Sequence, residues 1–158
     1  MSSVLNFVEL RSGKPADLPI IDTIMNNAFD PRYGEAWTRA QCMSILAMPG
    51  VWLTIAAMDG EPAGFALVRA AIDEAELLLL ATHPRMRRRG IGGALLRSTM
   101  HDAKDRNINY IFLEVRSDNE AIKLYQSFGF VQVGERRAYY RSPNGQLYNA
   151  LTLRCQLQ

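Results

Sequence analysis

The sequence predicts an α/β fold whose sheet is mostly antiparallel. Two helical segments precede three strand-like runs, and a helix, a strand, a helix and two strands follow. Short turns join the three runs, which favours an antiparallel meander, whereas a long helix before the next strand is typical of a parallel β-α-β unit. With 158 residues, 48% of them hydrophobic, the chain is expected to form a single domain over residues 1–158.

The helices are predicted from capping residues and from apolar residues that recur at helical spacing. Asp17 is the expected N-cap of the first helix. Thr38 and Gln41 have the spacing of a capping box for the second helix, and Gly129 is expected to end the last one. The expected helices are residues 18–29, a segment that begins after Thr38 and ends before Pro49, residues 90–106 and residues 119–129.

The strands are predicted from apolar runs that are bounded by turn residues. Asp59 and Gly60 favour a hairpin turn between the first two runs, and residues 142–145 favour a turn between the last two. The expected strands are residues 51–58, 63–71, 75–82, 110–115, 130–134 and 147–157.

Composition argues against several classes of protein. The net charge is only +2, so general nucleic-acid binding is not expected. No apolar stretch is long enough to span a membrane, and the first residues lack a signal-peptide pattern. Cys42 and Cys155 are too few for a disulfide framework and suit a reducing compartment, while His83 and His101 have no metal-ligand spacing. We expect a cytoplasmic protein without a metal, either a monomer or a homodimer.

A basic loop rich in glycine precedes the third helix. Its glycines leave backbone N–H groups uncovered at the helix start, where the helix dipole also favours an anion such as a phosphate. Adjacent arginines would add charge-assisted contacts. On these residues alone, a glycine-rich turn beside a solvated basic patch is an equal alternative. The Walker lysine is missing, and Leu95 occupies the place of the third glycine of a dinucleotide motif.

The spacing Arg87-x-x-Gly90-x-Gly92 resembles the acyl-CoA signature of the GCN5-related N-acetyltransferase (GNAT) family. The resemblance extends over residues 76–96 and 111–140, and it is strongest to the protein N-terminal acetyltransferases, including the ribosomal-protein-alanine type. It implies a mixed, twisted, mostly antiparallel sheet with helices on both faces. It also implies that acetyl-CoA binds in a V-shaped gap between the strands that contain Leu80 and Glu114.

The same resemblance implies which residues bind acetyl-CoA. A bulge in the first strand of the gap would free backbone N–H groups for the acetyl carbonyl and the pantetheine. The spacing to the helix is one residue short, so either Asp118 or Asn119 could match the family's asparagine; we prefer Asn119, whose amide both donates and accepts. The implied contacts are Leu80, Ala81, Thr82, Arg87, Arg88, Arg89, Gly90, Ile91, Gly92, Gly93 and Asn119.

Two side chains are candidates for the chemistry of direct acetyl transfer to a primary amine. Glu114 stands in an otherwise apolar strand, where a carboxylate is costly without a purpose or a partner. An ion pair with Arg116 or Arg137 would be a structural explanation, whereas the resemblance implies a proton acceptor that acts directly or through water. Tyr125 would ordinarily be a core tyrosine, but the resemblance implies that its hydroxyl protonates the CoA thiolate.

The amine substrate is expected beside aromatic residues. The resemblance implies that Phe29, Tyr33, Tyr139 and Tyr140 wall a slot for an N-terminal residue, although core packing would also explain them. Trp37 is explained by a hydrophobic staple before the second helix. We expect a protein N-terminus as the substrate, such as the alanine of a ribosomal protein. A small-molecule amine and a CoA-binding regulatory module without turnover are the alternatives.

Overall fold

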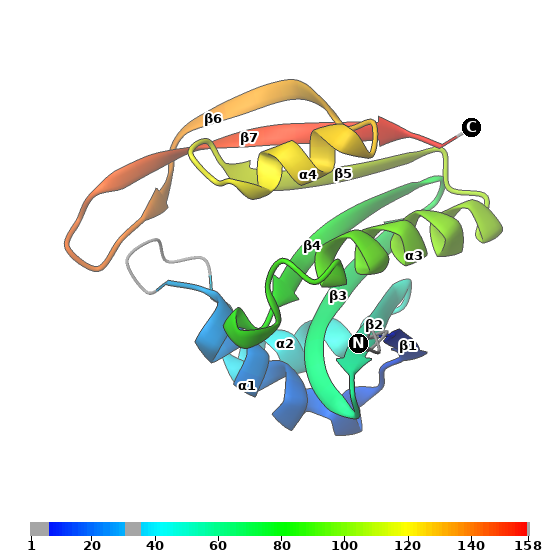
Figure 1. Ribbon diagram of the computed structural model, residues 1–158. Coiled ribbons are helices and arrows are strands. Elements are labelled where there is room, and N and C mark those ends of the chain that lie inside the picture. Colours follow the sequence, from blue (N-terminus) through cyan, green and yellow to red (C-terminus); the bar gives the residue numbers. More distant parts are fainter. Residues whose placement is uncertain (1–6, 31–35, 158) are drawn as a thin grey trace, which may run out of the picture.

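A computed structural model describes residues 7–30 and 36–157 and shows a seven-stranded sheet with helices on both faces (Figure 1). The strands are β1 (Val8–Ser12), β2 (Val51–Met58), β3 (Glu61–Ala71), β4 (Glu74–Thr82), β5 (Tyr110–Arg116), β6 (Val131–Arg141) and β7 (Leu147–Gln156). The helices are α1 (Leu18–Ala28), α2 (Arg39–Leu46), α3 (Ile91–Asp105) and α4 (Ala121–Ser127), with short 3-10 turns η1 (Pro15–Asp17) and η3 (Pro84–Met86).

The strand order confirms the predicted mixed sheet. It runs β1-β2-β3-β4-β5-β7-β6, in which β4 and β5 are parallel and all other neighbours are antiparallel. Helix α3 is the crossover of the parallel pair, as the sequence indicated. Strand β7 lies between β5 and β6. The second strand of the last hairpin therefore pairs with β5, and its first strand, β6, forms the edge of the sheet. None of the helices in the described part of the chain is long and apolar enough to cross a membrane.

Several local predictions are confirmed by backbone geometry. The amide of Gln41 donates to Thr38 Oγ1 at 3.2 Å, and the amide of Thr38 donates to Gln41 Oε1 at 2.7 Å, which completes the capping box. Asp59 and Gly60 both have positive φ, 53° and 78°, as a two-residue hairpin turn requires. Gly129 follows α4 with a φ of 93°, the left-handed conformation that glycine favours at a helix end.

Other local predictions were wrong or incomplete. Asp17 stands at the start of α1 but makes no capping bond with its side chain; its carboxylate instead accepts hydrogen bonds from the Arg11 guanidinium at 2.8 and 3.0 Å. Strand β1 was not predicted, and β6 continues to Arg141, well beyond residue 134. Both are edge strands whose residues are mostly exposed, so they lack the apolar alternation from which strands are predicted.

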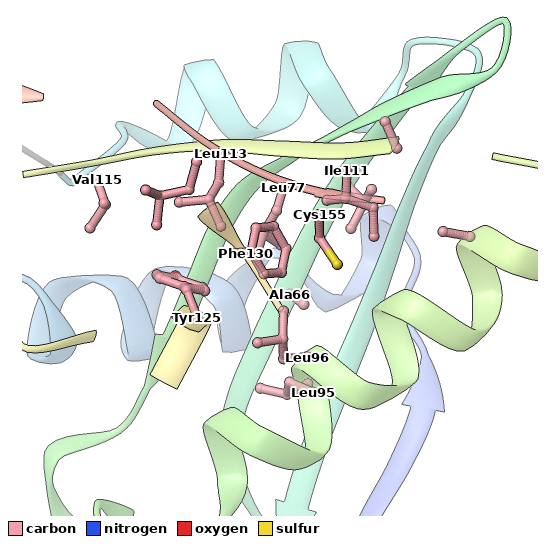
Figure 2. Close-up of a cluster of buried hydrophobic side chains, with 14 of the residues drawn as sticks. Ala66, Leu77, Leu95, Leu96, Ile111, Leu113, Val115, Tyr125, Phe130 and Cys155 are labelled. Carbon is pink, nitrogen blue, oxygen red and sulfur yellow. The ribbon is translucent and has the colours of Figure 1, made fainter. Parts of the chain in front are cut away.

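Each face of the sheet has its own hydrophobic core. Buried residues of α1 and α2 pack on one face with Leu53, Ile55 and Phe65. On the other face, α3 and α4 cover a cluster in which Phe130 and Tyr125 lie among residues of the sheet and of α3 (Figure 2). The residues labelled there are Ala66, Leu77, Leu95, Leu96, Ile111, Leu113, Val115, Tyr125, Phe130 and Cys155.

A bulge in β4 opens the sheet at its centre. Opposite β3, Leu67 pairs with Leu79 and Val68 pairs with Leu77, so Leu78 is the extra residue. The strand therefore changes faces: Leu77 packs in the core under α3 and α4, whereas Leu79 packs in the core under α1. Beyond the bulge β4 no longer pairs with β5, because their ladder stops at Glu76 opposite Phe112 (Figure 1). This arrangement confirms the predicted V-shaped gap.

Candidate active site

Two adjoining cavities occupy the gap between β4 and β5. The loop cavity, about 650 Å3, reaches from β4 to the start of α3. It is lined by Ala28, Phe29, Asp30, Leu80, Ala81, Thr82, Arg87, Gly92, Arg116, Asp118, Asn119, Glu120, Ala121, Leu124 and Tyr125. The strand cavity, about 200 Å3, lies toward the point where the two strands meet. It is lined by Phe29, Trp37, Glu76, Leu77, Leu78, Leu79, Leu80, Leu113, Glu114, Val115, Asn119, Ala121, Tyr125, Tyr139 and Tyr140.

The two cavities adjoin at shared residues. Phe29, Leu80, Asn119, Ala121 and Tyr125 line both. An elongated ligand in the loop cavity can therefore present its end to a second ligand in the strand cavity. A third cavity of about 550 Å3 lies elsewhere, between η1, β2 and the end of α3, and it shares no lining residue with the other two. We therefore place the candidate site in the gap.

The glycine loop has the geometry of an anion site at a helix start. Gly90 is the N-cap of α3 with a φ of 80°, and a Cβ atom there would meet no other atom within 4 Å. A Cβ on Gly92 would lie 3.2 Å from Leu124 Cδ2 of α4, so a side chain there would narrow the loop cavity. The first amides of the fifteen-residue α3 have no partner within the helix and face a bound anion favourably.

The three arginines before Gly90 are exposed and differ in their contacts. Arg87 donates from Nη2 to the carbonyl oxygen of Ala28 at 2.8 Å, which ties the loop to the end of α1. Arg89 lies 3.9 and 4.0 Å from the sulfurs of Met86 and Met58. No acidic residue in the described part of the chain pairs with these three cations, and Arg87 lines the loop cavity.

Glu114 lies at the strand cavity in an ion pair. Its Oε1 is 2.7 Å from Nε of Arg136, and its side chain is 18% exposed. The sequence suggested Arg116 or Arg137 as the partner of Glu114, and both suggestions were wrong. Arg116 pairs with Asp118, and Arg136 of β6 pairs with Glu114. The pairing crosses β7, which lies between the two strands, and no local signal in the sequence predicts that order.

Two more titratable groups surround Glu114. Partial burial raises the pKa of Tyr139, and the charge of Glu114 and a hydrogen bond to it raise it further. Shielding from water raises the pKa of Glu76, and the negative charge of Glu114 adds to this effect, while Arg136 and Arg69 oppose it. Tyr139 packs edge-to-face on Tyr140, with ring centroids 5.2 Å apart. The strand cavity is therefore lined by two carboxylates and three tyrosines, and Arg136 pairs with one of the carboxylates.

Tyr125 lies where the two cavities meet. Its ring is buried, at 7% exposure, and packs edge-to-face on Phe130 with centroids 5.7 Å apart. Figure 2 shows the ring in the core cluster that also contains Phe130 and Val115. Tyr125 is therefore a core residue, as its ordinary role predicts, and it also lines both cavities, as a functional role requires.

Comparison with known proteins decides the family. The model of the acetyltransferase (GNAT) family matches residues 18–130, which contain the glycine loop, both strands of the gap and Tyr125. The chain belongs to the GNAT family of acetyltransferases. The predicted fold of that family is confirmed by the sheet and by the gap described above.

Named relatives and solved structures support the assignment to the GNAT family. An N-alpha-acetyltransferase RimI of Mycobacterium tuberculosis is 35% identical over 119 residues, 72% of this chain and 73% of that protein. A [ribosomal protein bS18]-alanine N-acetyltransferase of Haemophilus influenzae is 36% identical over 94 residues, and the match spans 60% of this chain and 64% of that relative's length. The crystal structure of the ribosomal-protein-S18-alanine N-acetyltransferase from Escherichia coli matches with a TM-score of 0.86 and 28% identity, covering 96% of this chain and 95% of that one.

The gap brings together most of the residues predicted from the GNAT resemblance. Leu80, Ala81, Thr82, Arg87, Gly92 and Asn119 line the loop cavity, and Phe29, Glu114, Tyr125, Tyr139 and Tyr140 line the strand cavity. Arg88, Arg89, Gly90, Ile91 and Gly93 lie in the adjoining loop and the first turn of α3 without lining either cavity. The side chain of Ile91 is buried in the core, so only its backbone could contact a ligand. Tyr33 lies outside the described residues.

Asp118 and Asn119 have different local roles. The carboxylate of Asp118 is paired with the largely buried guanidinium of Arg116. Asn119 Oδ1 accepts a hydrogen bond from the amide of Ala121 at 2.8 Å at the start of α4, which leaves its side-chain NH2 to donate into the cavities. Both residues line the loop cavity, but only Asn119 also lines the strand cavity. This geometry supports the choice of Asn119 as the contact for acetyl-CoA.

Three residues of the site were missed from the sequence. Trp37, predicted only as a staple, also lines the strand cavity. Arg136 and Glu76 were not considered at all. Glu76 gave only a weak signal, since it is the last of three acidic residues, after Asp73 and Glu74, directly before the apolar run of β4. Arg136 gave none, because it stands in an exposed run of mixed charges.

Proposed function

We propose that this chain is an acetyl-CoA-dependent N-acetyltransferase that transfers the acetyl group directly to a primary amine, as a single domain over residues 1–158. One observation supports this most strongly: Glu114 and Tyr125 line one cavity that continues into a second cavity beside the glycine loop. Acetyl-CoA would lie in the loop cavity with its phosphates at the start of α3. The amine would approach from the strand cavity.

Each group of the site has a defined task in this reaction. Glu114 takes a proton from the incoming ammonium, directly or through a water, so that the neutral amine can attack the thioester carbonyl. Free backbone amides of β4 beside the gap would polarise that carbonyl. Tyr125 donates its hydroxyl proton to the sulfur as the C–S bond breaks, and CoA leaves as a thiol, while the second proton lost by the amine nitrogen restores the tyrosine hydroxyl. Cys42 is buried in α2 with a pKa raised by that burial, which speaks against a covalent cysteine intermediate.

The proposed acceptor is the α-amine of a protein N-terminus, of the ribosomal-protein-alanine type. The names of the Haemophilus and Escherichia coli proteins support this choice. So does the wall of Phe29, Trp37, Tyr139 and Tyr140, which leaves a strand cavity of about 200 Å3, of a size for one residue and its backbone.

A panel of acceptors tests the proposal. The protein is incubated with acetyl-CoA and peptides that begin with alanine, serine or lysine, and products are identified by mass spectrometry. Matched peptides with a blocked N-terminus and an internal lysine separate α-amines from side chains, and spermidine and free amino acids represent small amines. Acetylation of the free N-terminus alone supports the proposal. Turnover of the small amines in preference to peptides would replace it, and CoA binding without any turnover would indicate a regulatory module.

A further inference from the structure

We propose that Glu76 is a second catalytic carboxylate, which forms a pair with Glu114 that binds the ammonium form of the substrate and takes up one of its protons. This inference rests on the proposed function and adds a residue to its proton path. The step is R–NH3+ plus two carboxylates going to R–NH2 plus a pair that holds one proton. Glu76 then returns that proton to water before the next turnover.

The strand register places the two carboxylates on one face of the sheet. Glu76 is the last residue of β4 that pairs with β5, where it lies opposite Phe112. Glu114 is two residues further along β5, and side chains two apart in a strand point to the same face. Both side chains line the strand cavity at the closed end of the gap. An amine that enters this cavity therefore meets a carboxylate from each strand.

The ion pair of Glu114 gives a second carboxylate a role in the charge balance of the cavity. Glu114 is already neutralised by the ion pair with Arg136. A peptide α-amine with a pKa near 8 is mostly a cation at neutral pH, and an already neutral pair would attract it poorly. Glu76 supplies the negative charge that the incoming ammonium needs.

The two carboxylates also differ in their access to water. Glu114 is 18% exposed and held by Arg136, whereas Glu76 is a more exposed residue at the cavity wall whose carboxylate is only partly shielded from water. A proton acceptor must release its proton to solvent in every turnover, and Glu76 has the open path. We therefore assign uptake of the proton to the pair and its release to water to Glu76.

The groups that face Glu76 come from three other strands. Arg69 lies opposite it on β3, Glu114 lies on β5, and Arg136 and Tyr139 lie on β6. The pKa of Glu76 is raised by shielding from water and by Glu114, against the opposing effect of the two arginines. Two carboxylates that repel each other hold a shared proton more tightly than either would alone. The site thus favours uptake of one proton by the pair.

Glu76→Gln is the direct test, with Glu74→Gln as the matched control. Glu74 is two residues earlier on the same strand and lines none of the three cavities. Using an N-terminal peptide, kcat/KM is measured from pH 6 to pH 9.5 for both variants and the wild type. We expect Glu76→Gln to lose about tenfold to a hundredfold at neutral pH, and to recover above the pKa of the amine, where solvent has removed the proton. Glu74→Gln should stay near wild type throughout.

A double variant and a titration complete the test. If the carboxylates act as one unit, Glu76→Gln combined with Glu114→Gln should be no slower than the slower single variant. Additive losses, or a loss from Glu76→Gln that is the same at every pH, would overturn the proposal.

The titration needs no substrate. The carboxyl carbon of Glu76 is followed by 13C NMR in the wild type and in Glu114→Gln, and we expect its pKa to fall when the neighbouring charge is removed. An unchanged pKa of Glu76 in the Glu114→Gln variant would contradict the proposed interaction of the two carboxylates. Failure of the wild type to acetylate any peptide would contradict the proposed function instead, and the titration would still decide whether the pair exists.

Discussion

The Nε atom of Arg136 lies 2.7 Å from Oε1 of Glu114, across the strand β7 that separates their own strands. This contact fixes the carboxylate at the wall of the strand cavity. It also prevents Glu114 from being an isolated buried charge, which would be costly. The carboxylate is thus held in place at the cavity wall, where it can accept a proton from an amine, while its charge is already balanced by Arg136.

Glu114→Gln keeps the shape of the side chain and removes its basicity. We expect kcat/KM to fall about a hundredfold at neutral pH and to recover in part as the pH rises, because solvent then deprotonates the amine. The recovery should come at lower pH for an N-terminal α-amine, with a pKa near 8, than for a lysine near 10.4. The measurement is a pH–rate profile with both types of peptide.

A folded Glu114→Gln variant with an unchanged rate and profile would make this glutamate structural. Thermal unfolding checks that the variant is folded, since the substitution leaves Arg136 without its anion. Glu74→Gln is again the matched control for the loss of one carboxylate from the same sheet.

Tyr125→Phe should lower kcat and leave the affinity for acetyl-CoA nearly unchanged. The charge on the departing sulfur grows only in the transition state, so the hydroxyl contributes to rate more than to binding. A loss of about tenfold to a thousandfold fits a positioned acid, and the edge-to-face contact with Phe130 should keep the ring in place. Single-turnover kinetics separate chemistry from product release.

Tyr110→Phe provides the matched control for Tyr125→Phe. Tyr110 is at the start of β5, lines none of the three cavities and stacks with Arg154 at 4.8 Å. It should have wild-type turnover. Equal single-turnover rates for Tyr125→Phe and the wild type would return Tyr125 to a purely structural role.

Arg88→Gln should weaken CoA binding while Arg87→Gln also lowers stability. Arg88 has no hydrogen bond or ion pair among the described residues, so its charge is free to attract phosphate, whereas Arg87 bonds to the carbonyl of Ala28. Calorimetry with CoA and with pantetheine, at low and high salt, measures the effect. The loss should appear with CoA only and shrink at high salt, because salt screens exposed charges.

Arg141→Gln on β6 controls for the change in net charge. An equal loss of affinity for CoA and pantetheine in Arg88→Gln would show that the loop does not bind phosphate.

Asp17→Asn should lower the free energy of unfolding at neutral pH, and the difference from the wild type should disappear in acid. The Arg11 guanidinium and the amide of Lys14 lower the pKa of the Asp17 carboxyl in the folded state. A carboxyl whose pKa is lower in the folded than in the unfolded protein stabilises the fold at pH values above its unfolded pKa of about 3.9. This stabilisation disappears as the pH falls through the folded pKa. Urea unfolding midpoints for wild type and variant should therefore converge as the pH falls through the lowered folded pKa of Asp17.

Asp22→Asn is the comparison for Asp17→Asn. Asp22 pairs with Arg39, whose side chain is 61% exposed, and such surface pairs contribute little. A constant difference between Asp17→Asn and the wild type at every pH would show that the Arg11 contact does not supply the stability.

The sequence by itself determined the features that depend on neighbouring residues. Thr38 and Gln41 cap α2 because their side chains reach amides three residues away, and Asp59-Gly60 turns the β2–β3 hairpin because both residues accept positive φ. The glycine loop before α3 was predictable for the same reason. The resemblance to the GNAT family then added Glu114 and Tyr125, and both lie in the gap.

Tertiary structure decided which residues meet across the sheet. The bulge at Leu78 separates β4 from β5, and the insertion of β7 brings Arg136, rather than Arg116 or Arg137, to Glu114. Arg87 donates to the carbonyl of Ala28, 59 positions away in the chain. Glu76 lies near Glu114 only because of the register between β4 and β5, which are connected through α3. These pairings follow from the order and register of strands, which are set by the burial of whole faces and so cannot be derived from any short stretch of the chain.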